Sequence, residues 1–288
     1  MADSGAQDLF DVFGPPPPGS DPLLADLAAT ALAAATAAAR VLSEGVAGDM
    51  DVETKSSATD MVSNVDLASE AAVAEVLATR RPDDAVLGEE GTTSPGTSGV
   101  RWVVDPLDGT TNFLFGLPQF AVSIAAEIGP ETAVGVVLDP SRSEIWAAAR
   151  GWGARRNGRR CQVAAGRSTL DTALVATGFG YQAARRAWQA QVLANVLPAV
   201  RDVRRFGAAA LDLCWVGGGR FDAYYEWGLN PWDLAAGQLI CQEAGGRAEA
   251  LEGRVIVAAT PDLFGPLCDL LAAAGALEPP PGPEPRLW

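Results

Sequence analysis

The segment WVVDPLDGTTNF, residues 102–113, places two carboxylates directly after an apolar run. Its first three residues have the pattern of a buried strand. Asp105 and Asp108 then flank a turn that Pro106, with its fixed φ, is suited to begin. Such a turn can direct both carboxylates, and the carbonyl oxygen of Leu107 between them, toward one point. Oxygen ligands without nitrogen or sulfur are the set that Mg²⁺ prefers, so the segment predicts a Mg²⁺ site.

Gly109, Thr110 and Thr111 follow directly, and their backbone N–H groups are placed to open a helix. The N-terminus of a helix binds anions, so these amides can hold a phosphate against the metal ions. Metal-assisted hydrolysis of a phosphate ester needs such a cation site and anion site side by side. The alternative is an Asp-Gly turn between strands with solvated carboxylates, since such pairs commonly form turns. That alternative does not account for two acids and two threonines together, which favours the metal site.

Two acidic segments closer to the N-terminus are further candidates for the site. Glu89 and Glu90 follow a short strand. Adjacent residues of an extended chain point in opposite directions, so we expect only one of the two to face the site. Asp66 ends a polar, hydroxyl-rich stretch that begins at Lys55, and it stands at a predicted helix start. The structural alternatives are a solvated loop for the glutamates and a favourable helix-dipole interaction for Asp66.

Another carboxylate stands in the first turn of a helix predicted over residues 231–244. Asn230 suits the N-cap, Pro231 the first helical position and Gly245 the residue after the helix. Asp233 either complements the dipole of this helix or directs its carboxylate toward the metal site. The helix alone leaves both interpretations open.

The composition of the chain narrows its chemistry. It has no histidine, which excludes Ser-His and Cys-His nucleophile pairs and every zinc or iron site that uses histidine. The cysteines, at positions 161, 214, 241 and 268, form no CxxC pair and are predicted to be reduced, mostly buried thiols of a cytoplasmic protein. The formal net charge of −15 disfavours non-specific binding to nucleic acid or an anionic membrane. Catalysis is left to carboxylates, hydroxyls, a few basic groups and a divalent metal.

The 288 residues divide into four parts. Residues 1–20 are polar and Pro-rich and are predicted to be a disordered tail, without the positive start of a signal peptide. Residues 21–165 are predicted to form an α+β subdomain that binds metal and phosphate, residues 166–275 an α/β subdomain that completes the site, and residues 276–288 a Pro-rich C-terminal tail. The apolar stretch 23–42 is mostly alanine and contains Asp26 and Arg40, so a buried helix is favoured over a membrane span.

The hydrophobic pattern differs between the two halves. In the first half, helices are predicted over 22–45 and 66–81, followed by strands over 85–88, 101–105, 119–128, 132–139, 143–150 and one more within 151–158. In the second half, strands over 171–177, 202–205, 220–226 and 254–259 alternate with helices over 182–199, 207–216, 231–244 and 261–274. The predicted fold class is α/β, with an α+β first half built on a largely antiparallel sheet and a layered α/β second half.

Taken together, these segments resemble the inositol monophosphatase family of Mg²⁺-dependent, lithium-sensitive phosphatases. The first family motif is WVVDPLDGTTNF (102–113) and the second is WDLAAGQLICQEAGG (232–246), with the stretches 55–66 and 87–93 before them in the expected order. The resemblance extends to 204–210 and 221–226 and covers nearly everything from 22 to 275. The second half is most similar to actinobacterial and other bacterial inositol-1-monophosphatase-like members. The resemblance implies a layered αβαβα sandwich of the sugar-phosphatase type.

The resemblance also implies a role for each matching residue. The ligands of two to three Mg²⁺ ions would be Glu89, Asp105, the carbonyl of Leu107, Asp108 and Asp233. The attacking water would be oriented by the catalytic residues Glu89 and Thr110, the latter hydrogen-bonded to Asp66. The phosphate would be held by Gly109, Thr110 and Thr111, and the sugar by Glu226 and the 207–210 loop with Ala209. Lys55 would lie on a mobile loop near the phosphate.

The function that the resemblance implies is a cytoplasmic phosphoric monoester hydrolase for a small polyol phosphate, with myo-inositol 1-phosphate as the favoured substrate. Histidinol phosphate, fructose 1,6-bisphosphate and 3′-phosphoadenosine 5′-phosphate are alternative substrates within the superfamily. Gly91 stands where many members have serine, and Ala208 replaces a serine or threonine near the sugar site. Interaction with the transcription machinery, independent of catalysis, is the alternative from another class. The resemblance further implies inhibition by Li⁺ and a homodimer that binds neither nucleic acid nor membrane.

Overall fold

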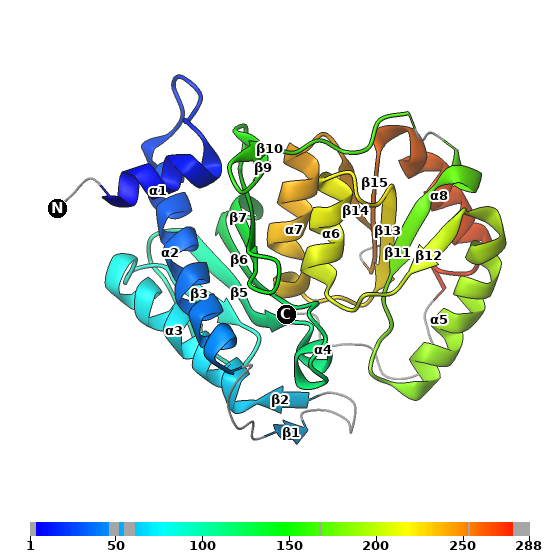
Figure 1. Cartoon of the computed structure of the whole chain (residues 1–288), viewed down its shortest axis with the longest axis horizontal. Coiled ribbons are helices and arrows are strands. Elements are labelled where there is room, and N and C mark those ends of the chain that lie inside the picture. Colours follow the sequence, from blue (N-terminus) through cyan, green and yellow to red (C-terminus); the bar gives the residue numbers. More distant parts are fainter. Residues whose placement is uncertain (1–3, 46–51, 55–60, 167–168, 253, 279–288) are drawn as a thin grey trace.

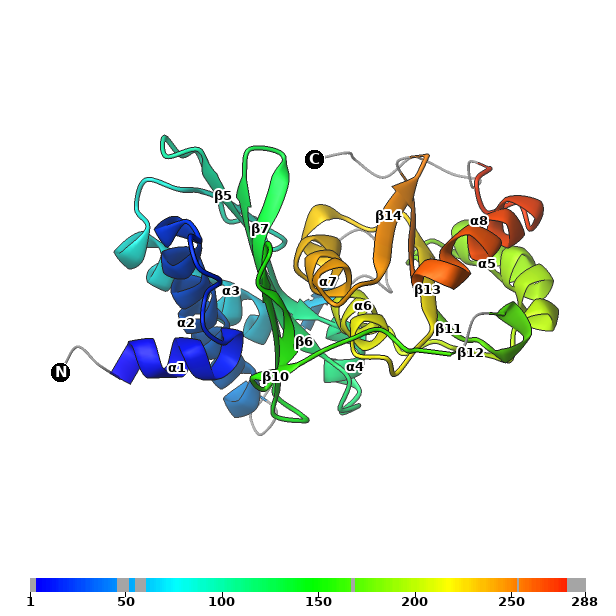
Figure 2. The ribbon, with the colours of Figure 1, turned by 90° about the horizontal axis from the view of Figure 1, so that it is seen from above.

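The computed structural model describes residues 4–45, 52–54, 61–166, 169–252 and 254–278. Its helices and sheets lie in five layers (Figures 1 and 2). Helices α2 (Pro22–Gly45) and α3 (Asn64–Arg80) cover one face of an eight-stranded sheet, and α6 (Ala209–Gly217) and α7 (Pro231–Glu243) lie between it and a five-stranded sheet. Helices α5 (Ala183–Val196) and α8 (Pro261–Ala273) cover the outer face of the second sheet. The predicted α/β class and the layered αβαβα sandwich are confirmed.

The eight-stranded sheet contains the strands of the first half except β1 (Val52–Thr54) and β2 (Met61–Ser63), which pair with each other. Their order is β10 (Arg159–Arg160), β9 (Gly153–Arg156), β8 (Glu144–Ala149), β7 (Glu131–Asp139), β6 (Ala121–Ile128), β5 (Val100–Asp108), β3 (Ala85–Gly88) and β4 (Thr93–Ser94). Every neighbouring pair is antiparallel except β3 with β5, as expected for a largely antiparallel sheet. Because helices cover both of its faces, β6 and β7 are almost continuous runs of buried residues.

The five-stranded sheet has the order β12 (Asp202–Arg204), β11 (Leu174–Thr177), β13 (Ala223–Trp227), β15 (Val255–Ala259) and β14 (Arg247–Leu251). Strand β11 is parallel to both of its neighbours, while β15 is antiparallel to β13 and β14. The alternation of strands and helices agrees with the sequence pattern, but β14 is a further strand that the pattern does not indicate. It lies at the edge of the sheet, and its exposed polar residues weaken the apolar signal.

The N-terminal segment corrects one prediction. A disordered tail was expected over residues 1–20, but Ser4–Phe13 form helix α1, in which Leu9 and Phe13 are buried. The ring of Phe13 meets Trp152 edge-on, with 6.4 Å between ring centroids. The two buried residues are four positions apart, which is the helical spacing that the proline-rich stretch after them obscured.

Helix α2 is the one helix in the described part of the chain that is long and apolar enough to span a membrane. It packs against α3 and against β6 and β7, and most of its buried residues are alanines. The buried helix predicted for this stretch is therefore present, because small side chains let it lie close to the sheet. Further elements absent from the sequence prediction are the β1 (Val52–Thr54) and β2 (Met61–Ser63) pair and the short helices η1 (Leu170–Thr172) and η2 (Leu197–Ala199). The C-terminal tail lies outside the described residues from position 279 on.

All four cysteines are free, and only Cys268 is partly exposed. Burial raises the pKa of the Cys161 thiol to about 11 and that of Cys241 to about 12. These thiols are therefore protonated at neutral pH and poorly reactive, in agreement with the prediction of structural thiols.

Candidate active site between the two halves of the chain

Strand β5 carries the first two carboxylates of the site. The turn predicted between Asp105 and Asp108 is wrong, because β5 continues to Asp108 and changes its register with β6 between these residues. Such an irregularity bends a strand and redirects its side chains, so it replaces the turn. The N–H of Leu107 donates to Oδ1 of Asp105 over 3.0 Å. Ser69 Oγ of α3 donates to the carbonyl of Pro106 over 2.9 Å and fixes the bend.

Asp108 connects the two halves of the molecule. Its Oδ1 accepts a hydrogen bond from the N–H of Ala209 (3.1 Å), and its Oδ2 accepts one from the N–H of Ala210 (2.8 Å). Both amides belong to the first turn of α6, where N–H groups have no partner inside the helix. The family resemblance implies that Ala209 lies at the sugar, and nothing in the sequence indicates this contact with Asp108.

Asp233 lies in the first turn of α7. The N–H of the N-cap residue Asn230 donates to its Oδ2 over 2.7 Å, and Pro231 occupies the first turn as predicted. The helix ends at Glu243, and Gly245 follows with a φ of 88°, again as predicted. Asp233 therefore caps its helix, and the charges of Glu89 and Asp108 act on it as well.

Glu89 follows β3, and its N–H donates to the carbonyl of Val104 in β5 over 3.1 Å. This bond keeps Glu89 beside the end of β5, and the charge of Glu89 raises the pKa of Asp105 after the larger effect of burial. The next residue, Glu90, donates its N–H to Glu70 Oε2 over 2.8 Å. Of the two glutamates, Glu89 is thus the one coupled to the carboxylates of β5.

Asp105 and Asp108 are buried, and the partly exposed Asp233 and Glu89 lie close enough for their charges to act on Asp105. Burial is the largest cause that raises the pKa of each aspartate, and the neighbouring carboxylates raise it further. For Asp108 the pKa reaches about 7, although the amides of Ala210 and Ala209 act in the opposite direction. Burying like charges together is unfavourable unless a cation compensates them.

The donor set fits a hard divalent cation. It consists of carboxylate oxygens and the carbonyl of Leu107, which are the ligands of Mg²⁺ rather than of zinc or iron. Within the described residues, no group of three or more acidic or cysteine side chains closes by itself around one metal position. The acids stand on separate segments, after β3, at the end of β5 and in the first turn of α7, so a cation is needed to draw them together.

Thr110 opens the short helix α4 (Thr110–Leu114) beside these acids. Its Oγ1 lies 3.1 Å from Oδ1 of Asp66 and 3.1 Å from the carbonyl of Leu107. The predicted hydrogen bond between Thr110 and Asp66 is therefore present. Asp66 also caps α3, because its Oδ2 accepts from the N–H of Ser63 over 2.9 Å. Asp66 thus lies in the first turn of α3, as its helix-dipole interpretation requires, and also contacts Thr110.

Gly109 precedes α4 with a φ of 91°, a conformation that favours glycine. A Cβ at this position would lie 2.8 Å from the carbonyl oxygen of Gln119, so the close approach of the two backbones also requires glycine. Thr110 is buried, while Gly109 and Thr111 are partly exposed. The amides predicted to hold the phosphate thus begin a real helix at the edge of the carboxylate cluster. Lys55, also predicted at the phosphate, lies outside the described residues.

Glu226 in β13 comes from the second half of the chain. Its Oε2 accepts a hydrogen bond from the hydroxyl of Tyr224 over 2.7 Å. Burial raises the pKa of Glu226, while Tyr224 and Arg205 act in the opposite direction. Its charge raises the pKa of Asp108, which brings the predicted sugar ligand and the predicted metal ligand into one site.

Asp212 is a candidate that the sequence analysis missed. It is buried in α6, and its Oδ1 has no hydrogen-bond partner among the described residues. Burial, followed by the charges of Glu226 and Asp108, raises its pKa well above the ordinary value. The signal in the sequence is a single acid inside the apolar run AALDLCWV.

Comparisons with known proteins agree with the predicted family and fold. The model of the family described as "Inositol monophosphatase family" matches residues 23–278. A relative named Inositol-1-monophosphatase SuhB from Mycobacterium tuberculosis is 46% identical over 248 residues, covering 81% of this chain and 86% of that protein. A relative named Nus factor SuhB from Pasteurella multocida is 45% identical over 219 residues, covering 75% and 82%. The crystal structure of the extragenic suppressor protein suhB from Bartonella henselae superposes with a TM-score of 0.80 at 38% identity, covering 84% of this chain and 96% of that one.

Proposed function

Because this chain belongs to the inositol monophosphatase family, we propose that it is a Mg²⁺-dependent phosphatase whose substrate is myo-inositol 1-phosphate. The observation that carries the proposal is a group of four carboxylates beside the start of α4, contributed by Glu89, Asp105, Asp108 and Asp233. Burial, and then repulsion within the group, raises the pKa of the three aspartates. A cation site and an anion site in contact are what phosphate-ester hydrolysis requires.

Different residues of the site would hold the metal ions and the phosphate. Glu89, Asp105, Asp108, Asp233 and the carbonyl of Leu107 would hold two to three ions. When bound, Mg²⁺ supplies the positive charge that polarises the phosphate and acidifies water. The backbone amides at Gly109, Thr110 and Thr111 hold the phosphate oxygens at the start of α4. No histidine is needed for any of these roles, in keeping with its absence from the sequence.

Thr110 and Asp66 orient the attacking water. The Thr110 hydroxyl has a single proton, and Asp66 Oδ1 and the carbonyl of Leu107 lie at equal distance from it. When the hydroxyl donates its hydrogen bond to Asp66, a lone pair of the Thr110 oxygen can accept a hydrogen bond from water. Glu89 is the second acceptor in the same place. The proposed result is a water held by two acceptors in line with the phosphate.

The sugar is bound from the second half of the chain. The carboxylate of Glu226, fixed by Tyr224, is an acceptor for hydroxyl groups of a polyol. Ala208 and Ala209 line the start of α6 without any side-chain hydroxyl, so this wall provides shape and backbone groups only. The competing substrates are histidinol phosphate, fructose 1,6-bisphosphate and 3′-phosphoadenosine 5′-phosphate. A different polar contact at this wall would change which of the esters the site prefers.

A panel of these phosphate esters, assayed with Mg²⁺ and ranked by kcat/KM, tests the proposal. We expect myo-inositol 1-phosphate to rank first and activity to disappear when EDTA removes the metal. A higher kcat/KM for histidinol phosphate or a bisphosphate would replace the substrate, and phosphate release that is unaffected by EDTA would contradict the metal mechanism.

A role in transcription complexes is the second candidate function, because several relatives are named Nus factor SuhB. It does not require the metal ligands. Capture of RNA polymerase from a lysate by the Asp108→Asn variant as well as by the wild-type protein would support it. Capture of polymerase by neither protein would leave the phosphatase as the function. We also propose that the protein is cytoplasmic, as suits a substrate that is a small metabolite.

A further inference from the structure

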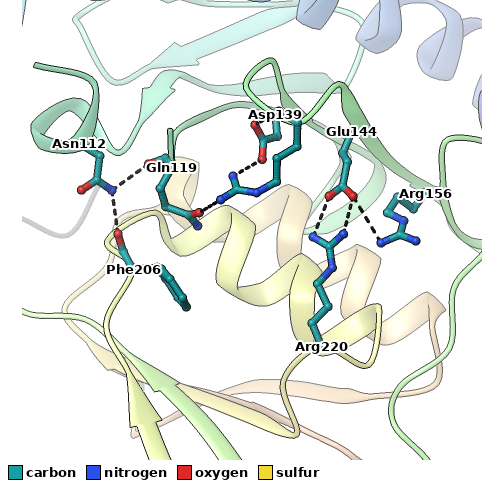
Figure 3. Close-up of polar contacts among 8 residues, drawn as sticks. Asn112, Gln119, Asp139, Glu144, Arg156, Phe206 and Arg220 are labelled. Atoms are coloured by element: carbon teal, nitrogen blue, oxygen red, sulfur yellow. Dashed lines mark hydrogen bonds and ion pairs between the residues drawn. The ribbon is translucent and has the colours of Figure 1, made fainter. Parts of the chain in front are cut away.

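Asn112, the residue after the two threonines, is 6% exposed, and its side-chain amide faces backbone carbonyls from two distant segments. Nδ2 donates to the carbonyl of Phe206 over 2.7 Å and to that of Gln119 over 2.8 Å, with the carbonyl of Gly207 at 3.4 Å (Figure 3). An amide has two N–H groups, so the two shorter bonds use both. Asn112 therefore joins the first half of the chain to the segment that leads into α6.

The segment 108–112 holds the start of α6 at a second point. Asp108 accepts hydrogen bonds from the N–H groups of Ala209 and Ala210, which are two and three residues beyond Gly207. Gly207 turns the chain between the two contacts with a φ of 80°. Asn112 thus binds carbonyls on one side of this turn, and Asp108 binds amides on the other side. The position of the turn decides whether the amides of α6 reach Asp108.

Gln119, one of the two closer partners of Asn112, is itself held in place. The side chain of Gln119 accepts from Arg142 Nη2 over 2.7 Å, and Arg142 Nη1 lies 2.7 Å from Oδ2 of Asp139 (Figure 3). Arg142 also lies over the ring of Trp215 in α6, 5.1 Å from its centroid. The Gln119 end of this link is therefore fixed independently of Asn112, so Asn112 can hold the 206–207 segment against it.

We propose that Asn112 is a positioning residue, which sets the 206–207 turn so that the first turn of α6 meets Asp108 and the sugar-binding wall at Ala209 stays in register with the phosphate-binding amides. The inference rests on the proposed function for its kinetic part only. Asn112 need not contact the substrate. By holding the backbone carbonyls of the 206–207 turn, it would place the amides of α6 against Asp108.

The test compares Asn112→Leu, which keeps the size of the side chain and removes both donors, with Arg220→Gln as a matched control. Arg220 Nη1 donates to Glu144 Oε2 over 2.8 Å (Figure 3). Arg220 also lies over the rings of Trp146 and Trp215. The control thus removes another polar link between β8 and the loop after α6. Asn112→Ser serves in place of the leucine variant should that variant not fold.

Two measurements decide the outcome. In hydrogen exchange of the metal-free protein, we expect segment 206–212 to lose protection in Asn112→Leu and to keep it in Arg220→Gln. In kinetics with myo-inositol 1-phosphate, we expect kcat to fall by about 10- to 100-fold in Asn112→Leu with a smaller change in KM, because misplacing a reacting group by about 1 Å has effects of this size. The control should retain kcat within a few-fold at a similar loss of Tm.

Equal protection of segment 206–212 in both variants, or equal kcat values, would overturn the inference. A wild-type protein that hydrolyses no ester of the panel would instead contradict the proposed function. In that case the exchange experiment, which uses no substrate, still decides whether Asn112 holds the start of α6.

Discussion

At the scale of single residues, the candidate site concentrates negative charge that the protein alone does not neutralise. Hydrogen bonds from backbone amides hold Asp105, Asp108 and Asp233 in place, but burial and mutual repulsion still raise their pKa values. A bound cation would offset this repulsion and draw the carboxylates together.

Replacing Asp108 by asparagine separates the role in metal binding from the role in folding. We expect kcat to fall by at least about 10²-fold, comparable to the loss of one transition-state contact worth roughly 3 kcal/mol. In the metal-free protein, the relief of repulsion offsets the loss of one amide hydrogen bond, so the free energy of unfolding should change by less than about 1 kcal/mol. Phosphate release and urea unfolding of Asp108→Asn measure the two effects.

Glu226→Gln is the control for that substitution. It keeps a hydrogen-bond acceptor for Tyr224 and lies on the proposed sugar side, so we expect a higher KM or an altered substrate order with the Mg²⁺ dependence unchanged. Near-wild-type turnover in Asp108→Asn, with normal Mg²⁺ dependence, would show that this carboxylate group is not the catalytic metal site.

Li⁺ should inhibit the enzyme uncompetitively with respect to substrate. The expectation follows from the ligand set of Asp105, Asp108 and Asp233, in which Li⁺ would bind while phosphate is still held at Gly109, Thr110 and Thr111. Initial rates at several substrate concentrations, with millimolar Li⁺ and low Mg²⁺, give the pattern. Unchanged rates, or inhibition that substrate relieves, would contradict this assignment of the second metal site.

At the scale of elements, each site segment is held by a contact outside the site. The turn between α3 and β3 is an example, because Asp84 in it accepts hydrogen bonds from Arg81 Nε (2.7 Å) and Trp102 Nε1 (2.9 Å). Trp102 is in β5, so Asp84 ties the turn to the strand that carries the metal ligands. Burial opposes the ionisation of Asp84 most strongly, but the hydrogen bonds from Arg81, Ser98 and Trp102 together outweigh it and lower its pKa.

Asp84 should therefore make stability depend on acid pH. Its folded-state pKa is below its ordinary value of 3.8, so its contribution is present above that pH and is lost as pH falls through the lower folded value. We expect Asp84→Asn to lower the free energy of unfolding at neutral pH and to reduce the loss of stability below about pH 4. Urea unfolding of both proteins between neutral and acidic pH measures this. Parallel curves for the two proteins would contradict it.

Helix α1 is the element with the clearest test of burial. Phe13 is 2% exposed and packs on Trp152, so Phe13→Ala should lower the free energy of unfolding by about 3 kcal/mol. Phe10, which is 45% exposed in the same helix, is the matched control, and Phe10→Ala should change stability by less than about 0.5 kcal/mol. Equal effects of the two substitutions would show that α1 does not pack as described.

At the scale of the whole molecule, the site exists only where the two halves meet. Glu89, Asp105 and Asp108 come from the first half, while Asp233 and Glu226 come from the second. Neither half alone holds a complete set of ligands, so separated halves should not hydrolyse phosphate esters.

We expect the protein to form a homodimer, as the family resemblance implies. Phe115 and Leu117, which follow α4, are 72% and 52% exposed, and apolar side chains that cluster on a surface are candidates for an interface. Light scattering at micromolar concentration should give twice the 29.8 kDa of the chain. A mass of one chain under these conditions would exclude the homodimer.

The local features of this protein, such as its main helices, strands and helix ends, could be predicted from the sequence alone. The alanine-rich composition of α2 predicts a helix, and apolar runs predict the strands from β5 to β8, because these signals lie within each segment. The ends of α7 can also be predicted from the sequence, since Asn230, Pro231 and Gly245 each suit the backbone conformation at a helix end. The candidate ligands were identified because their residue types and order match a family motif.

Features that depend on contacts between distant segments of the chain are seen only in the tertiary structure. It replaced the turn after Asp105 by a register change in β5, and it showed that Asp108 receives its hydrogen bonds from α6. Helix α1 is ordered because Phe13 finds Trp152, a partner that no local pattern reveals. Asn112 was read as part of a motif, yet its partner Phe206 is 94 positions away. Contacts of this kind are set by the packing of the two halves, and no periodicity within either half determines them.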